Sequence, residues 1–209
     1  MNSGTSAPRW QSWGGGGVLA AAVLQGTGLV GYYLTSVRAP ALAVVIAGGF
    51  ALLAATALLL ATFPLALGTT RTNGIVGASQ TGRIALIATG VFVLLARVTT
   101  LGFFMVGFPF AGGIAQTADA LAILAVITGA VASVVIWRSG IAAGAARWSL
   151  ALAVVIATVA ELASGYNGTL SWALAVASVA SLGFAGLSYV RTQPSFSRGA
   201  RGRVKNLAE

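Results

Sequence analysis

Six long apolar segments, joined by short connections, constrain this chain more than any other feature of its sequence. A helix needs about 20 mostly apolar residues to cross a bilayer core about 30 Å thick. The segments span residues 18–36, 41–66, 84–106, 119–137, 148–164 and 169–190. Inside a bilayer each segment must satisfy its own backbone hydrogen bonds, which a helix does. The sequence therefore predicts an all-α fold, a polytopic membrane helix bundle with six transmembrane helices.

The composition removes most classes of chemistry. Only 7% of the 209 residues are charged, whereas a soluble domain carries about 25%. The chain has no His and no Cys, which excludes disulfides and metal sites built on imidazole or thiolate. We expect no cofactor and no enzyme activity, because the acids within or beside the segments, Asp119 and Glu161, lie at different predicted depths and have no partner base.

Positive charge predicts the orientation. Basic residues of membrane proteins concentrate on the cytoplasmic side. With six spans, every Lys and Arg except Arg38 and Arg97 falls on one side, together with both termini. We therefore expect a multi-pass protein of a bacterial cytoplasmic membrane, with a disordered cytoplasmic segment at 1–17 and a basic cytoplasmic tail at 191–209. The first segment is long for a signal peptide and has no clear cleavage site, so we expect it to be retained.

Two charged residues fall well inside the predicted spans. Arg97 lies 14 residues after Arg83, and Glu161 lies 14 residues after Arg147. At 1.5 Å per residue, each is roughly 21 Å from its cytoplasmic anchor. Because a charge within the bilayer needs a partner or a water-filled cavity, this equal depth predicts an ion pair between Arg97 and Glu161.

Asp119 is the third member of this intramembrane polar cluster. It lies near the predicted outer interface and either caps the start of its helix, as acids favour, or comes within reach of Arg97. The cluster itself has two interpretations. Arg97 and Glu161 lock two spans together, or they form a solute or proton site that opens outward.

The sixth segment carries a stripe of small residues at helical spacing. These are Ser171, Ser178, Ser181 and Ser188, with alanines between them. Small faces let membrane helices pack closely, so the stripe predicts a contact with another span or with a second copy; Ser as a filler in an Ala-rich chain is the alternative. The G-x-G-x-x-G pattern at 26–31 lies inside an apolar segment, so it indicates helix packing rather than nucleotide binding.

Two function classes remain. The first is a non-catalytic accessory subunit that binds a membrane protein partner or a second copy, with the lipid bilayer around it and no nucleic acid. The second is a small-solute or proton-coupled permease, or the membrane-embedded substrate-binding subunit of a transporter, with its site near Arg97 and Glu161. A cavity that reaches these residues favours transport, whereas a filled bundle with an exposed small-residue face favours the accessory role.

Overall fold

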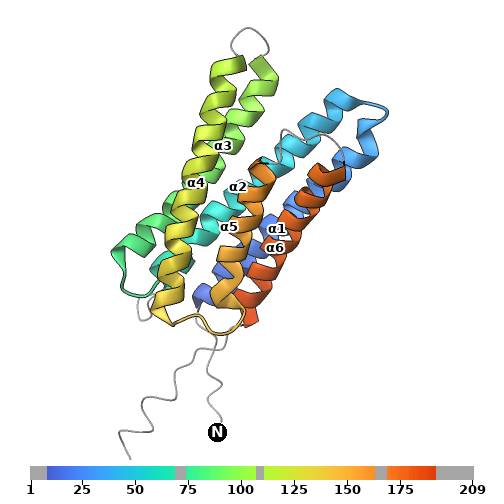
Figure 1. The fold of residues 1–209 in the computed structure, drawn as a ribbon. Coiled ribbons are helices and arrows are strands. Elements are labelled where there is room, and N and C mark those ends of the chain that lie inside the picture. The colour runs from blue at the N-terminus through green and yellow to red at the C-terminus, as the bar shows by residue number, and fades with distance from the viewer. Residues whose placement is uncertain (1–8, 69–73, 107–110, 163–168, 192–209) are drawn as a thin grey trace, which may run out of the picture.

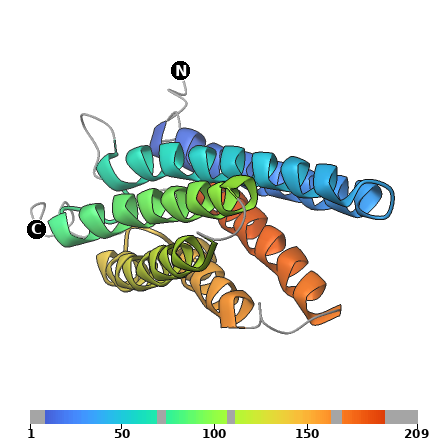
Figure 2. The same cartoon turned by 90° about the horizontal axis from the view of Figure 1, so that it is seen from above.

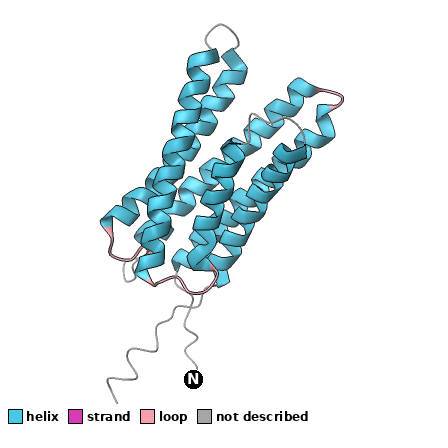
Figure 3. Cartoon of the chain, in the orientation of Figure 1, coloured by secondary structure: helices cyan, strands magenta, loops and turns pink. Residues whose placement is uncertain are grey.

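The described part of the chain is entirely helical apart from its connections. The computed structural model describes residues 9–68, 74–106, 111–162 and 169–191, with side chains for 11–68, 74–103, 113–160 and 172–191. These residues form six helices and no strand (Figure 3). The helices are α1 (Arg9–Ser36), α2 (Pro40–Leu67), α3 (Gln80–Val106), α4 (Ala111–Ser139), α5 (Ala146–Leu162) and α6 (Thr169–Arg191).

Length and composition make this a helical membrane bundle. Five helices are long and apolar enough to cross a bilayer, and α5 is a shorter apolar helix over Ala146–Ala160. Large apolar side chains also cover the outside of the bundle, such as Val30, Ile84 and Val155, each more than half exposed. Such a surface is stable against lipid chains and not against water. The predicted all-α membrane bundle is therefore confirmed.

The helices form a ring in chain order (Figures 1 and 2). Within the described residues, each helix packs against its two neighbours in sequence, α6 returns to α1, and no pair packs across the ring. The closing contact is tight where Gly186 of α6 meets the backbone of Gly15 and Leu19. At the other end of the same pair, the rings of Tyr33 and Trp172 meet edge to face at 6.1 Å. This arrangement leaves the middle of the bundle without a helix.

The first helix begins earlier than the sequence indicates. α1 starts at Arg9 and runs through the four glycines at 14–17, so the prediction that residues 9–17 lie outside the first helix is wrong. Residues 1–8 lie outside the described part of the chain. The glycines bring α1 onto α2: a Cβ on Gly17 would lie 2.7 Å from that of Ala61, and one on Gly28 would lie 2.7 Å from that of Phe50. Gly28 belongs to the G-x-G-x-x-G pattern, whose predicted packing role is confirmed.

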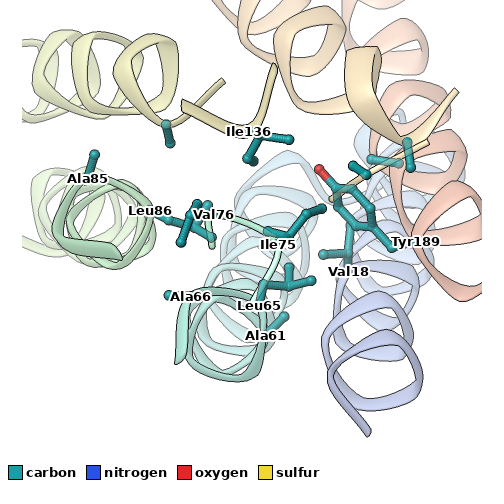
Figure 4. Packing of buried hydrophobic residues seen from close by; sticks show 14 residues of the cluster. Val18, Ala61, Leu65, Ala66, Ile75, Val76, Ala85, Leu86, Ile136 and Tyr189 are labelled. Atoms are coloured by element: carbon teal, nitrogen blue, oxygen red, sulfur yellow. The ribbon is translucent and has the colours of Figure 1, made fainter. Parts of the chain in front are cut away.

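One end of the ring is closed by a cluster of buried apolar side chains (Figure 4). The start of α1 and the end of α6 lie at this end (Figure 1), and the buried cluster includes Val18, Leu65 and Tyr189. The described Arg83, Arg138, Arg147 and Arg191 all lie on this side of the bundle. Their clustering supports the prediction that this end faces the cytoplasm; below it is called the basic end.

A short segment, Gly74–Gly77, folds back beneath the ring and is called the plug below. Its two apolar side chains, Ile75 and Val76, are each 1% exposed. The Ile75 amide donates to the Leu65 carbonyl over 2.8 Å, and the Ser139 hydroxyl donates to the Ile75 carbonyl over 3.0 Å. The plug therefore joins the ends of α2 and α4 and blocks the middle of the ring at the basic end.

The plug also depends on two special backbone positions. A Cβ on Gly74 would overlap the carbonyl oxygens of Leu65 and Ala66, so only glycine fits there. Gly77 has a φ of 66°, a conformation that glycine adopts at little cost. The Arg83 guanidinium donates to the Gly77 carbonyl over 3.1 Å, which ties the end of the plug to the first turn of α3.

Candidate functional site: a cavity inside the helix ring

The middle of the ring is a cavity of about 300 Å³. All six helices and Ile75 of the plug line it. The cause is visible in the side chains that point inward, most of which are Ala, Gly, Ser or Thr rather than Leu or Phe. A ring of six helices leaves a central space, and these side chains are too small to fill it. The cavity is therefore a product of both the topology and the inward-facing sequence.

The cavity is closed at the basic end and opens at the other. Five lining residues at the basic end are buried: Val18, Leu65, Ile75, Ile136 and Tyr189 are all at most 4% exposed. Figure 4 shows these side chains converging from four helices and the plug. At the opposite end the α3–α4 pair leans away from α1, α2 and α6 (Figure 1), and the lining includes exposed charged side chains.

Two of those side chains are Arg97 of α3 and Asp119 of α4. A hydrogen bond of 3.1 Å between the hydroxyls of Thr89 and Thr128 aligns the two helices. Arg97 lies eight residues beyond Thr89, and Asp119 lies nine residues beyond Thr128 in the same direction. At 1.5 Å per residue, these are rises of about 12 and about 14 Å. The two opposite charges are thus at nearly the same height.

Gln25 of α1 reaches this level from the other side of the ring. Both α1 and α3 contact α2, which allows their heights to be compared. Gly28 of α1 packs against Phe50, and Gly90 of α3 packs against Leu59, which lies nine residues further along α2 toward the basic end. Gln25 lies three residues toward the basic end from Gly28, and Arg97 lies seven residues away from that end relative to Gly90. The two side chains therefore leave their helices within about one residue's rise of each other. Gln25, Arg97 and Asp119 are called the polar tier below.

The structure corrects the expectation for the helix that carries Asp119. α4 begins at Ala111, so Asp119 lies in its third turn and the capping hypothesis is wrong. Its carboxylate is exposed at the cavity instead. No ion pair joins Arg97 to Asp119 in the part of the chain that the structure describes. The charges are close in height and unpaired with each other.

The predicted partner of Arg97 is not part of the described lining. Glu161 lies in the last turn of α5, and its side chain is outside the described residues, so the Arg97–Glu161 ion pair stays a prediction. The described residue next to it, Ala160, lines the cavity.

The small-residue stripe of α6 faces inward over part of its length. Ser178 and Ser181 line the cavity, and Ser181 is buried. Ser188 is half-buried near the basic end, and the side chain of Ser171 is outside the described residues. The hydroxyls of Ser178 and Ser181 donate to carbonyls of their own helix. A close approach of α6 to α1 is made at Gly186 instead.

Sequence reasoning missed the plug and the extent of the cavity. The connection that holds the plug reads as polar, and its only signal is the apolar pair Ile75–Val76 between glycines. The described residues contain no group of three His, Cys, Asp or Glu side chains that could hold a metal ion. No family model matches the sequence, and no curated protein or solved structure is significantly similar to it.

Proposed function

We propose that the protein binds a small solute inside the membrane, as a small permease or as the substrate-binding subunit of a transporter. The cavity and its polar tier carry this proposal. An accessory subunit needs only a filled bundle, whereas a cavity lined by six helices and reaching Arg97 and Asp119 has the concave, mostly apolar form of a ligand site. In this proposal the shorter helix α5 also crosses the membrane, which brings the number of spans to six, and both termini are cytoplasmic.

The electrostatics of the site support solute binding over a purely structural role. A charged side chain within a bilayer costs at least about 2.5 kcal/mol on insertion scales, and it usually faces a cavity or a partner. Arg97 and Asp119 both face the cavity and are not joined to each other. Two charges that are not joined to each other do not lock α3 to α4, but they can recognise a polar ligand. In the proposed orientation that ligand enters from the side opposite the cytoplasm.

A cavity-filling substitution tests this function. Ala122→Phe places a ring in the cavity from α4, while Ala130→Phe puts the same ring on an exposed part of the same helix that does not line the cavity. We expect native mass spectrometry to detect a co-purifying small molecule on the unaltered protein and on Ala130→Phe, and to find it lost from Ala122→Phe. A protein that carries no small molecule in any form, or equal retention in both variants, contradicts the proposal.

A further inference from the structure

The polar tier and the apolar depth below it define a chemical class of ligand. This inference rests on the proposed function and concerns the same cavity. Arg97 offers a guanidinium and Asp119 a carboxylate at nearly the same height on neighbouring helices. Each is charged and exposed to the cavity, and neither neutralises the other. A ligand with a single charge would satisfy one of them and leave the other facing it with the wrong sign.

A ligand that carries both signs satisfies both groups at once. Arg binds carboxylate or phosphate through its planar fork of donors, and Asp accepts hydrogen bonds from an ammonium group. Gln25 completes the tier from α1, since its amide can both donate and accept. The three side chains together suit a compact head group with neighbouring positive and negative charges.

The cavity wall between the polar tier and the plug offers few free hydrogen-bond donors. From Arg97 down to Leu86, eleven residues of α3 span roughly 16 Å of the lining. The hydroxyls on this wall are engaged with their own helices: Thr62 donates to the Leu59 carbonyl over 2.7 Å, and Ser178 to the Leu174 carbonyl over 2.9 Å. Alanine and the larger apolar side chains of Val, Leu and Ile form most of the remaining surface. An apolar body fits this space, and a second polar group on the ligand would find few donors there.

We infer that the cavity binds an amphipathic zwitterion, a molecule with adjacent anionic and ammonium groups on an apolar body. Its anion lies at Arg97, its ammonium group at Asp119, and its apolar part points toward the plug and Tyr189. A volume of about 300 Å³ is at the small end of ligand pockets. Two sources share this chemistry: a free α-amino acid with an apolar side chain, and the head of a phosphatidylethanolamine.

Binding of four probes to the full-length protein in a non-ionic detergent tests the inference. The probes are L-leucine, dihexanoyl phosphatidylethanolamine, 4-methylpentanoate and 3-methylbutylamine. The last two keep the apolar body of leucine with only one charge each. Because a charge-assisted hydrogen bond is worth tenfold or more in affinity, we expect one zwitterion to bind at least about tenfold more tightly than both single-charge probes. Which zwitterion binds identifies the source.

Variants of the polar tier separate recognition from folding. Arg97→Gln should abolish the preference for the zwitterion over the amine, and Asp119→Asn should abolish its preference over the acid. Arg38→Gln is the matched control, since Arg38 is an exposed cation at the same end of the bundle and does not line the cavity. A misfolded variant loses binding of every probe. By contrast, Arg97→Gln should still bind the amine through Asp119, and Asp119→Asn should still bind the acid through Arg97.

Three different results overturn different statements. If a small molecule co-purifies and Ala122→Phe expels it, but the acid or the amine binds as tightly as either zwitterion, the inferred ligand class is wrong and the proposed function stands. If tier variants leave the zwitterion preference unchanged, the inferred role of Arg97 and Asp119 is wrong. If no molecule co-purifies and no probe binds, both the ligand class and the proposed function fail.

Discussion

The substitution Gly74→Ala should open the basic end of the bundle. The new methyl group would overlap two carbonyl oxygens of α2, and backbone atoms cannot rotate away from it as a side chain could. Overpacking of this kind costs about 1–3 kcal/mol, and a contact with backbone puts Gly74 at the upper end of that range. A cost of about 3 kcal/mol raises the population of the displaced plug roughly 100-fold.

The cost of the substitution is compared with the free energy of the contacts that hold the plug in place. Ile75 and Val76 are each 1% exposed, and burying such a side chain contributes about 1.5–3 kcal/mol. The hydrogen bond from the Ile75 amide to the Leu65 carbonyl adds about 1 kcal/mol. Displacement therefore costs about 4–7 kcal/mol in the unaltered protein. After Gly74→Ala roughly 1–4 kcal/mol remains, so the plug still seats most of the time but leaves often.

The natural absence of cysteine allows a direct assay. Val76→Cys introduces a single thiol into the plug, and its rate of maleimide labelling reports how often the plug leaves. We expect labelling to be about 100-fold faster when Gly74→Ala is also present. Ala78→Cys, at an exposed position just after the plug, should react at one fast rate in both backgrounds. Equal rates for Val76→Cys with and without Gly74→Ala would refute the reasoning.

Two further substitutions test the closed end of the ring. Gly186→Ala adds a Cβ 2.8 Å from the Leu19 amide nitrogen and should lower the thermal unfolding temperature in detergent. Gly183→Ala is the control, because its Cβ would come no closer than 3.9 Å to a neighbour, and it should leave that temperature unchanged. Equal effects would mean that close approach at Gly186 does not hold α6 to α1. Tyr189→Ala empties a buried position of the core cluster and should cost about 3–5 kcal/mol, measured by denaturant unfolding; a loss below about 1 kcal/mol would show that this side chain does not stabilise the closed end.

The positions of the helices are largely predictable from the sequence. Apolar length alone placed the second and sixth segments within one residue of α2 and α6, because a bilayer leaves helices as the available structure for such segments. The ends of helices are harder. The four glycines at 14–17 look like a flexible stretch, but three of them, Gly14, Gly15 and Gly17, allow α1 to approach α2 and α6. That packing outweighs the cost of glycine in a helix.

The candidate site could be predicted only in part. Counting from basic residues put Asp119 about 7 Å further out than Arg97, whereas the bond between Thr89 and Thr128 aligns them. The error arises because Arg83 and Arg138, the two reference points, lie at different heights on their helices. The plug was missed for another reason: two apolar residues between glycines carry no periodicity, and their burial depends on α2 and α4, which are distant in sequence.

The chain-order ring has a consequence for biosynthesis. The α3–α4 pair brings Arg97 and Asp119 into the bilayer as one hairpin with no net charge from these two residues, which lowers the cost of inserting them. The wall between α5 and α1 stays open to lipid until the last helix emerges, since α6 alone contacts both. A nascent chain that stops before Thr169 therefore presents a cleft to the lipid. Only the final helix converts that cleft into a cavity sheltered from the bilayer.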